Sequence, residues 1–235
     1  MQKKIMIMPS LLAGDFGNLE ASARKAEACG GDALHMDIMD AHFVPNLSMG
    51  PDVVRMARRC LGIPLNVHLM MTHPHLYVRA FIEAGASTLL IHVEAQCDIR
   101  ATLRQIRDLG AAPGLAINPE TPVSALFPWL DEINEVLFMT VHPGFGGQEF
   151  MGEVVPSIAG LCRRLDGPGG ARFQALDIAV DGGINLRTVE AAAAAGANAF
   201  VAGNALYTAR DMARDAALMR SGAAAAFGRD VFPAA

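Results

Sequence analysis

Short apolar runs alternate with longer amphipathic segments along the whole sequence. Eight runs have the length of a strand, at Ile5–Met8, Ala33–Met39, Leu65–Met70, Thr88–His92, Pro113–Ile117, Glu135–Thr140, Leu176–Val180 and Ala199–Val201. Segments with helical periodicity lie between them, at Asn18–Cys29, Pro51–Cys60, Leu76–Ala84, Ile99–Leu109, Val154–Leu165 and Leu186–Ala195. Strands that alternate with helices pair in parallel through right-handed crossovers. The pattern therefore predicts an α/β protein with a parallel sheet.

Such a sheet can close into a barrel or stay open with helices on both faces. Eight regular units, with no Gly-x-Gly-x-x-Gly after the first run, favour the closed form. The length of 235 residues is near the about 250 that an eight-stranded barrel needs. We expect one (β/α)₈ TIM barrel over residues 1–235. We also expect a loosely held tail at 221–235, although Ala223–Ala226 could instead extend a final helix.

The amino-acid composition limits the kinds of molecule that the chain can bind. Hydrophobic residues make up 52% of the chain, charged residues 18%, and the net charge is −5. Such a chain offers no basic field for nucleic acid or an anionic membrane. The N-terminal apolar stretch is too short for a signal peptide, and no run approaches the ~18 apolar residues of a membrane span. We therefore expect a cytoplasmic protein.

Polar residues gather where the apolar runs end. In a barrel of this kind the chemistry lies at the carboxyl ends of the strands. Read in order, the residues at these ends are Ser10, His35, Asp37, His68, His92, Asn118, His142 and Asp181.

Four of these residues form a candidate metal site. His35 and Asp37 lie on the same face of one predicted strand, because strand side chains alternate. Each of the four has an ordinary structural explanation when taken alone. Together, His35, Asp37, His68 and Asp181 offer two imidazoles and two carboxylates at one end of the barrel. This donor set suits one divalent ion such as Zn²⁺, Fe²⁺, Mn²⁺ or Co²⁺.

Glycine-rich turns follow the last three strands. They lie at Pro143–Gln148, Asp181–Gly183 and Ala202–Asn204. Glycine lets backbone N–H groups approach an anion closely, and barrels often bind phosphate after strands 7 and 8. The turns predict a phosphate site at the same end as the metal site.

Methionines and lysines refine this prediction. Met39, Met70 and Met139 fall near strand ends, where they are either core residues or an apolar cap that keeps water from a reactive intermediate.

All three lysines, Lys3, Lys4 and Lys25, precede the second strand. No strand end offers an amine, so Schiff-base aldolase chemistry is excluded.

Five segments of the sequence resemble the ribulose-phosphate 3-epimerase family. They are Leu34–Asp40, His42–Leu47, Val67–Met70, Pro143–Gln148 and Val180–Gly183, and the resemblance extends from about Pro9 to Tyr207. It implies a metal ion bound by His35, Asp37, His68 and Asp181, with Asp37 and Asp181 as the two acid/base residues. It also implies substrate contacts by Ser10, His68, Gly144, Phe145, Gly146, Gly147, Gly182, Gly183, Gly203 and Asn204.

Two positions depart from the family pattern. His142 stands where the family usually has Asn, and Asn204 stands where it usually has Ser. Asn204 can still donate to a phosphate. Position 142 varies among relatives that act on other ketoses, so His142 either reshapes the pocket for another sugar or only supports the glycine-rich turn.

The expected reaction is epimerisation at C3 of a ketose phosphate. Asp37 and Asp181 would remove and return the C3 proton on opposite faces through a metal-stabilised enediolate. D-ribulose 5-phosphate and D-xylulose 5-phosphate are the expected pair, and D-allulose 6-phosphate is the alternative. A metal-dependent aldolase and a non-catalytic phosphate-binding barrel are the rival functions. No organic cofactor is expected. The expected partners are the sugar phosphate and further copies of the chain, in a number that the sequence does not define.

Overall fold

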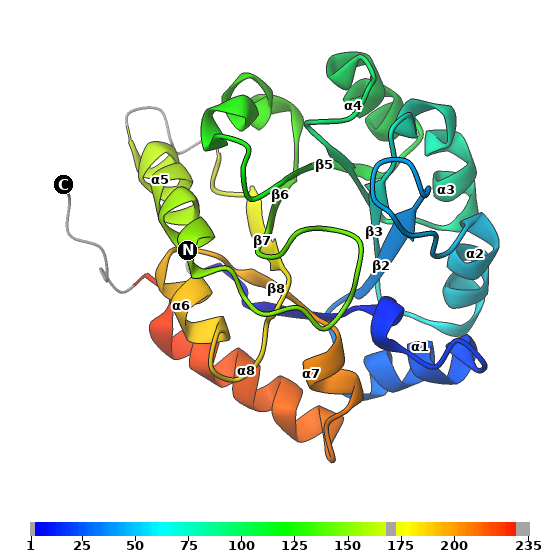
Figure 1. Ribbon diagram of the computed structural model, residues 1–235, viewed down its shortest axis with the longest axis vertical. Coiled ribbons are helices and arrows are strands. Elements are labelled where there is room, and N and C mark those ends of the chain that lie inside the picture. Colours follow the sequence, from blue (N-terminus) through cyan, green and yellow to red (C-terminus); the bar gives the residue numbers. More distant parts are fainter. Residues whose placement is uncertain (1–2, 168–172, 229–235) are drawn as a thin grey trace.

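The computed structural model describes residues 3–167 and 173–228. Its centre is a parallel sheet of eight strands, in the order β1-β8-β7-β6-β5-β4-β3-β2. The two outer strands, β1 and β2, come together through a parallel bridge between Ser10 and His35, so the sheet curls into a barrel (Figure 1). The strands are β1 (Met6–Pro9), β2 (Leu34–Met39), β3 (Leu65–Met70), β4 (Thr88–His92), β5 (Ala112–Ile117), β6 (Glu135–Met139), β7 (Asp177–Asp181) and β8 (Ala199–Ala202).

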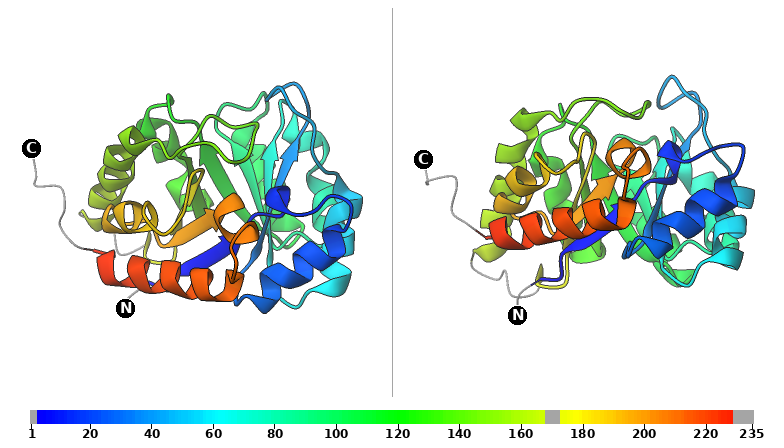
Figure 2. Two further views of the ribbon diagram at one scale, coloured as in Figure 1. Left: turned by 60° about the horizontal axis from the view of Figure 1, so that its bottom comes forward. Right: turned by 90° about the horizontal axis from the view of Figure 1, so that it is seen from below.

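Helices surround the barrel on the outside (Figures 1 and 2). In the described part of the chain the α-helices are α1 (Leu19–Ala28), α2 (Pro51–Cys60), α3 (Val78–Ala84), α4 (Ile99–Asp108), α5 (Val155–Asp166), α6 (Val189–Ala194), α7 (Asn204–Tyr207) and α8 (Met212–Ala226). Short 3₁₀ helices lie at η1 (Leu11–Ala13), η2 (Pro74–Leu76), η3 (Val123–Glu132) and η4 (Gly152–Val154). None of the helices formed by these residues has the length and apolar character needed to cross a membrane.

Side-chain alternation divides the core into two parts. Along β4, Leu89 and Ile91 face the surrounding helices, whereas Leu90 joins the cluster inside the barrel. The interior cluster also contains Met139 and Val201 from other strands. Because one face of each strand is reserved for the barrel interior, the polar residues on that face converge.

The prediction of an eight-stranded parallel barrel is confirmed. The bounds of each predicted strand agree with the structure to within one residue. The residues after Ser221 agree with the alternative prediction, in which Ala223–Ala226 extend a final helix. Ser221 to Ala226 form the last turns of α8, and Ala223 is fully buried, so this part is not a loose tail. Residues 229–235 lie outside the described residues.

Candidate active site

Four side chains meet at the carboxyl end of the barrel strands. His35 and Asp37 come from β2, His68 from β3 and Asp181 from β7, and one potential ligand atom from each lies within 4.8 Å of the others. The Asp37 Oδ1 atom lies 3.1 Å from His35 Nε2 and 3.2 Å from His68 Nδ1. His35 Nε2 is also 3.8 Å from Asp181 Oδ2. These four residues, predicted from the sequence as a set, could therefore hold one metal ion.

Strand register explains why residues distant in sequence meet here. Asp37 of β2 is directly opposite His68 of β3, and His35 is opposite Asn66. Residues at matching positions of parallel strands share a face, so all four side chains point into the barrel. Both imidazoles are fully buried, and the Asp181 side chain keeps 16% of its surface exposed.

The two carboxylates have different proton affinities. Burial acts against a charge on Asp37, but the charge and hydrogen bond of His35, together with the adjacent His68, hold its pKa well below the usual range. Burial raises the pKa of Asp181 to about 7, and the negative charge of Asp37 adds to this effect. Burial opposes the His35 charge too, yet Asp37 and Asp181 raise the pKa of His35 to about 9. A site with two carboxyl groups of such different pKa contains both a proton acceptor and a proton donor near neutral pH.

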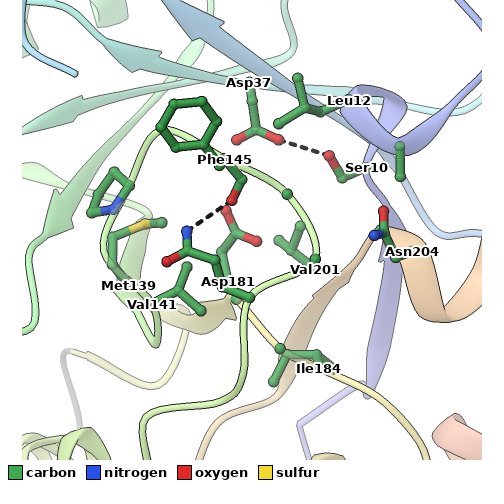
Figure 3. A pocket seen from close by; sticks show the side chains of 18 of the residues that line it. Ser10, Leu12, Asp37, Met139, Val141, Phe145, Asp181, Ile184, Val201 and Asn204 are labelled. Atoms are coloured by element: carbon green, nitrogen blue, oxygen red, sulfur yellow. Dashed lines mark hydrogen bonds between the residues drawn. The ribbon is translucent and has the colours of Figure 1, made fainter. Parts of the chain in front are cut away.

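A cavity of about 250 Å³ opens above these groups. Figure 3 shows Asp37 and Asp181 pointing into it from different strands, with Asn204 at one side and Met139 at the other. The Ser10 hydroxyl donates a 2.7 Å hydrogen bond to Asp37 Oδ2. The predicted residues that line the cavity are Ser10, Asp37, Met39, Met70, Met139, Gly144, Phe145, Gly146, Gly147, Asp181, Gly182, Gly183, Gly203 and Asn204. His68, also predicted to contact substrate, does not line it and is fully buried.

Sequence reasoning did not identify several apolar residues of the cavity wall. These are Leu12, Val141, Ile184 and Val201. Apolar residues next to strands are too common in a barrel sequence to mark a site. The three methionines also line the cavity, and Met39 and Met70 pack together with Val44. This supports the prediction that they contribute to an apolar cap.

The segment between β6 and α5 crosses the end of the barrel (Figures 1 and 2). We call residues 143–148 the flap. The Gln148 side chain donates to the carbonyls of His142 and Phe145, and Asn46 donates to the carbonyl of Gly144. Gly147 has a φ of +78°, and a Cβ on it would lie 2.6 Å from Asn204 Nδ2. Glycine at this position therefore lets the flap approach Asn204 at the cavity edge.

His142 does not occupy the position expected for a residue that selects the sugar. Its Nδ1 atom lies 2.8 Å from Glu120 Oε1, and both side chains are mostly exposed. Its neighbours Val141 and Pro143 line the cavity, whereas His142 does not. Its exposure and its pairing with Glu120 therefore place the His142 imidazole outside the cavity.

Two polar pairs lie behind the histidines, and all their members are buried except Glu94, which is partly exposed. Asn66 accepts from His35 Nδ1 at 2.8 Å and donates to Glu135 Oε2 at 2.8 Å. His92 Nε2 lies 2.8 Å from His68 Nε2, and His92 Nδ1 lies 3.0 Å from Glu94 Oε2. His92 is among the polar residues at the predicted strand ends, but none of these four residues is among the predicted metal, catalytic or substrate residues. A signal was available, because Asn66-x-His68 and His92-x-Glu94 repeat the spacing of His35-x-Asp37.

Glu135 makes a testable contribution to stability. Burial outweighs the opposing charge of His35 and raises the pKa of Glu135 from 4.5 to about 7. Between these pH values the unfolded chain loses the proton while the folded protein keeps it. The contribution of Glu135 to the free energy of unfolding is therefore fully present below pH 4.5. It falls by on the order of 3 kcal/mol as the pH rises to about 7.

Replacing Glu135 by Gln should remove this loss and keep an acceptor for Asn66. We expect the variant to gain stability over the native protein at pH 8 but not at pH 4.5. Urea unfolding of both metal-free proteins at several pH values measures the difference. If the difference does not grow with pH, Glu135 is not protonated in the folded state.

Comparison with known proteins identifies relatives. Residues 6–207 match the ribulose-phosphate 3 epimerase family. The chain is 42% identical over 203 residues to ribulose-phosphate 3-epimerase from Bacillus subtilis (strain 168), covering 86% of this chain and 92% of that protein. It is 39% identical over 220 residues to ribulose-phosphate 3-epimerase from Escherichia coli (strain K12), covering 93% and 96%.

Solved structures support the fold. The structure of KGPDC from Streptococcus mutans superposes with a TM-score of 0.70 at 13% identity, covering 96% of this chain and 100% of that one. At this identity the likeness shows a shared barrel and nothing further. The sequence matches extend over most of this chain and of the relatives at about 40% identity. We conclude that the chain belongs to the ribulose-phosphate 3-epimerase family and is an isomerase of carbohydrate phosphates.

Proposed function

We propose that the protein interconverts D-ribulose 5-phosphate and D-xylulose 5-phosphate by moving the proton at C3. One observation carries the proposal: Asp37 and Asp181 reach the same cavity from different strands, and both belong to the His/Asp cluster. A C3 epimerase needs two proton-transferring groups that approach one carbon from opposite faces, and this cavity supplies two carboxyl groups. The names of the two relatives above support the same substrates.

The cluster fits one divalent ion. Two imidazole nitrogens and two carboxylates suit Zn²⁺, Fe²⁺, Mn²⁺ or Co²⁺ better than a hard ion that prefers oxygen ligands alone. We assign His35, Asp37, His68 and Asp181 as the residues that hold it. When bound, the ion supplies a Lewis acid that favours the negatively charged enediolate over the neutral ketose.

The two carboxyl groups perform the proton transfers. The low pKa of Asp37 keeps it ionised and able to accept the C3 proton from one epimer. Asp181, which reaches the cavity from β7, donates a proton to the other face of the same carbon. The roles exchange in the reverse direction. The Ser10 hydroxyl holds one oxygen of Asp37 in place, and the methionines exclude water from the enediolate.

The glycine-rich turns bind the phosphate in this proposal. Gly146 and Gly147 of the flap, Gly182 and Gly183 after β7, and Gly203 with Asn204 after β8 all line the cavity. At Gly183 the φ is +66°, and a Cβ there would lie 2.4 Å from the backbone nitrogen of Phe150. Only glycine fits at this position. Without a Cβ, its backbone N–H group can approach an anion in the cavity. Binding energy from a phosphate remote from C3 can then orient the reacting carbon.

Product analysis separates this function from its rivals. The metal-loaded protein incubated with D-ribulose 5-phosphate should yield D-xylulose 5-phosphate as the only new species in ¹³C NMR. Carbon–carbon cleavage fragments would instead indicate an aldolase. The absence of any turnover with ketose phosphates would indicate a binding protein.

The orientation of His142 predicts how the sugar is selected. Because its imidazole pairs with Glu120 outside the cavity, replacing His142 by Asn should change the preference between substrates very little. We expect the ratio of kcat/KM for D-ribulose 5-phosphate to that for D-allulose 6-phosphate to stay within about threefold, less than 1 kcal/mol of discrimination. A tenfold shift would show that His142 turns toward the sugar and would favour the allulose 6-phosphate alternative.

A further inference from the structure

A third imidazole, that of His92, and a third carboxylate, that of Glu94, lie behind His68. The two Nε2 atoms of His68 and His92 are 2.8 Å apart, and His92 Nδ1 is 3.0 Å from Glu94 Oε2. Both rings are fully buried. Neither His92 nor Glu94 lines the cavity or belongs to the metal-ligand cluster. Their influence on the site must therefore pass through His68.

The Glu94 carboxylate is fixed at both oxygens. Its Oε1 atom accepts from the backbone N–H of Asn118 at 2.9 Å and from the Thr121 hydroxyl at 2.6 Å. Burial acts against its charge, but hydrogen bonds from His92, Thr121 and Asn118 lower its pKa below the usual value. An ionised carboxylate only accepts hydrogen bonds. Oε2 therefore requires a hydrogen on His92 Nδ1.

The contact between the two rings has room for a single hydrogen. If two N–H groups met at 2.8 Å, their hydrogens would collide, and if both nitrogens were bare, their lone pairs would repel. A histidine that binds a metal ion through one ring nitrogen is neutral and carries its single hydrogen on the other nitrogen. The Nδ1 atom of His68 is the one that faces Asp37. A metal ion on this Nδ1 requires the hydrogen on Nε2, and His92 Nε2 must then be the acceptor.

We propose that Glu94 and His92 are positioning residues that hold His68 in the tautomer whose Nδ1 can bind the metal ion. The inference rests on the metal site of the proposed function. Glu94 accepts from His92 Nδ1, His92 Nε2 accepts from His68 Nε2, and His68 Nδ1 is left bare toward the cluster. Carboxylates commonly orient metal-binding histidines in this way, here with one imidazole interposed.

The variant Glu94→Gln tests this relay because it keeps the size of the side chain and reverses one hydrogen bond. The two donors at Asn118 and Thr121 hold the Gln carbonyl oxygen, so the Gln NH₂ group faces His92 Nδ1. The relay then reverses: His92 donates from Nε2, and His68 carries its hydrogen on Nδ1 and donates it to Asp37. Every group still has a partner, but the nitrogen that should bind the metal is blocked.

We expect the E94Q protein to bind Zn²⁺ about 10–100-fold more weakly, measured by competition with a chromophoric chelator. We expect its metal-free form to melt at the native temperature, because its hydrogen bonds stay satisfied. The variant Glu94→Asp is the matched control. It shortens the side chain but keeps an acceptor, so it should bind Zn²⁺ more tightly than E94Q does. Thr121→Val, which removes one anchor of Glu94, should also retain more affinity than E94Q.

Two results would overturn the relay while leaving the proposed function in place. One is Zn²⁺ affinity of E94Q within threefold of the native value, or equal to that of E94D. The other comes from ¹⁵N NMR of the Zn²⁺-loaded native protein: His92 should be neutral with a bare Nε2, and hydrogens on both nitrogens would contradict the relay. A native protein that binds none of the four candidate metal ions would instead overturn the proposed metal site itself.

Discussion

Replacing either Asp37 or Asp181 by Asn should nearly abolish net epimerisation. Removing a positioned acid or base costs about 10²–10⁴-fold, and each substitution also removes a carboxylate ligand from the cluster. We therefore expect kcat to fall by at least about 10³-fold in both variants. A coupled assay that detects D-xylulose 5-phosphate measures the loss, and metal analysis of each variant separates lost proton transfer from lost metal.

Asp177→Asn provides the matched control for this experiment. Asp177 begins β7, the strand that ends with Asp181, and its carboxylate accepts a 2.8 Å hydrogen bond from Asn198 away from the cavity. D177N removes a carboxylate from the same strand as D181N does, but Asp177 does not line the cavity. We therefore expect kcat of D177N to stay within a few-fold of the native value. If D37N or D181N retained its metal and lost less than tenfold in kcat, the assignment of two proton-transferring groups would be wrong.

Removing the metal should have a comparably large effect. A Lewis acid contributes several kcal/mol to enediolate formation, so protein freed of metal by a chelator should lose at least about 10³-fold in kcat. Added Zn²⁺, Fe²⁺, Mn²⁺ or Co²⁺ should restore activity. Mg²⁺ should restore it poorly, because it prefers oxygen ligands and the cluster contains two imidazoles. Full activity in protein shown to be metal-free would contradict the proposal.

The strands were predictable because their limits have local causes. The apolar runs of strand length are separated by residues that start or end helices; Asn18, for example, caps α1 by accepting from the backbone N–H of Ala21. The segment after β5 forms the 3₁₀ helix η3 rather than an α-helix, and Pro128 inside it lacks the N–H that a regular helix would use. Asn185 accepts from the backbone of Arg187 and Thr188, which delays the start of α6 to Val189.

The site was predictable only in part. His35, Asp37, His68 and Asp181 could be assembled from the sequence because each lies on the inward face of a predicted strand, and Asp181 ends its strand. Glu135 lies at the opposite end of β6, and its contact with Asn66 crosses between strands that are not neighbours. The pairing of Glu135 with Asn66 depends on how the barrel closes and on the register of its strands. Neither can be read from the sequence of a single strand. The orientation of His142 likewise depends on the pairing with Glu120, which follows a different strand.

The most direct test of two-carboxylate epimerisation is deuterium transfer during the first turnovers in D₂O. The metal-loaded protein is given D-ribulose 5-phosphate, and both epimers are examined by ¹H NMR and mass spectrometry at low conversion. If Asp37 and Asp181 serve opposite faces, the D-xylulose 5-phosphate formed first carries deuterium at C3, because its proton comes from the carboxyl group that did not accept the original one. The remaining D-ribulose 5-phosphate should carry little deuterium at this stage. Product that retains the original C3 hydrogen would show that a single group moves the proton, and would contradict the account.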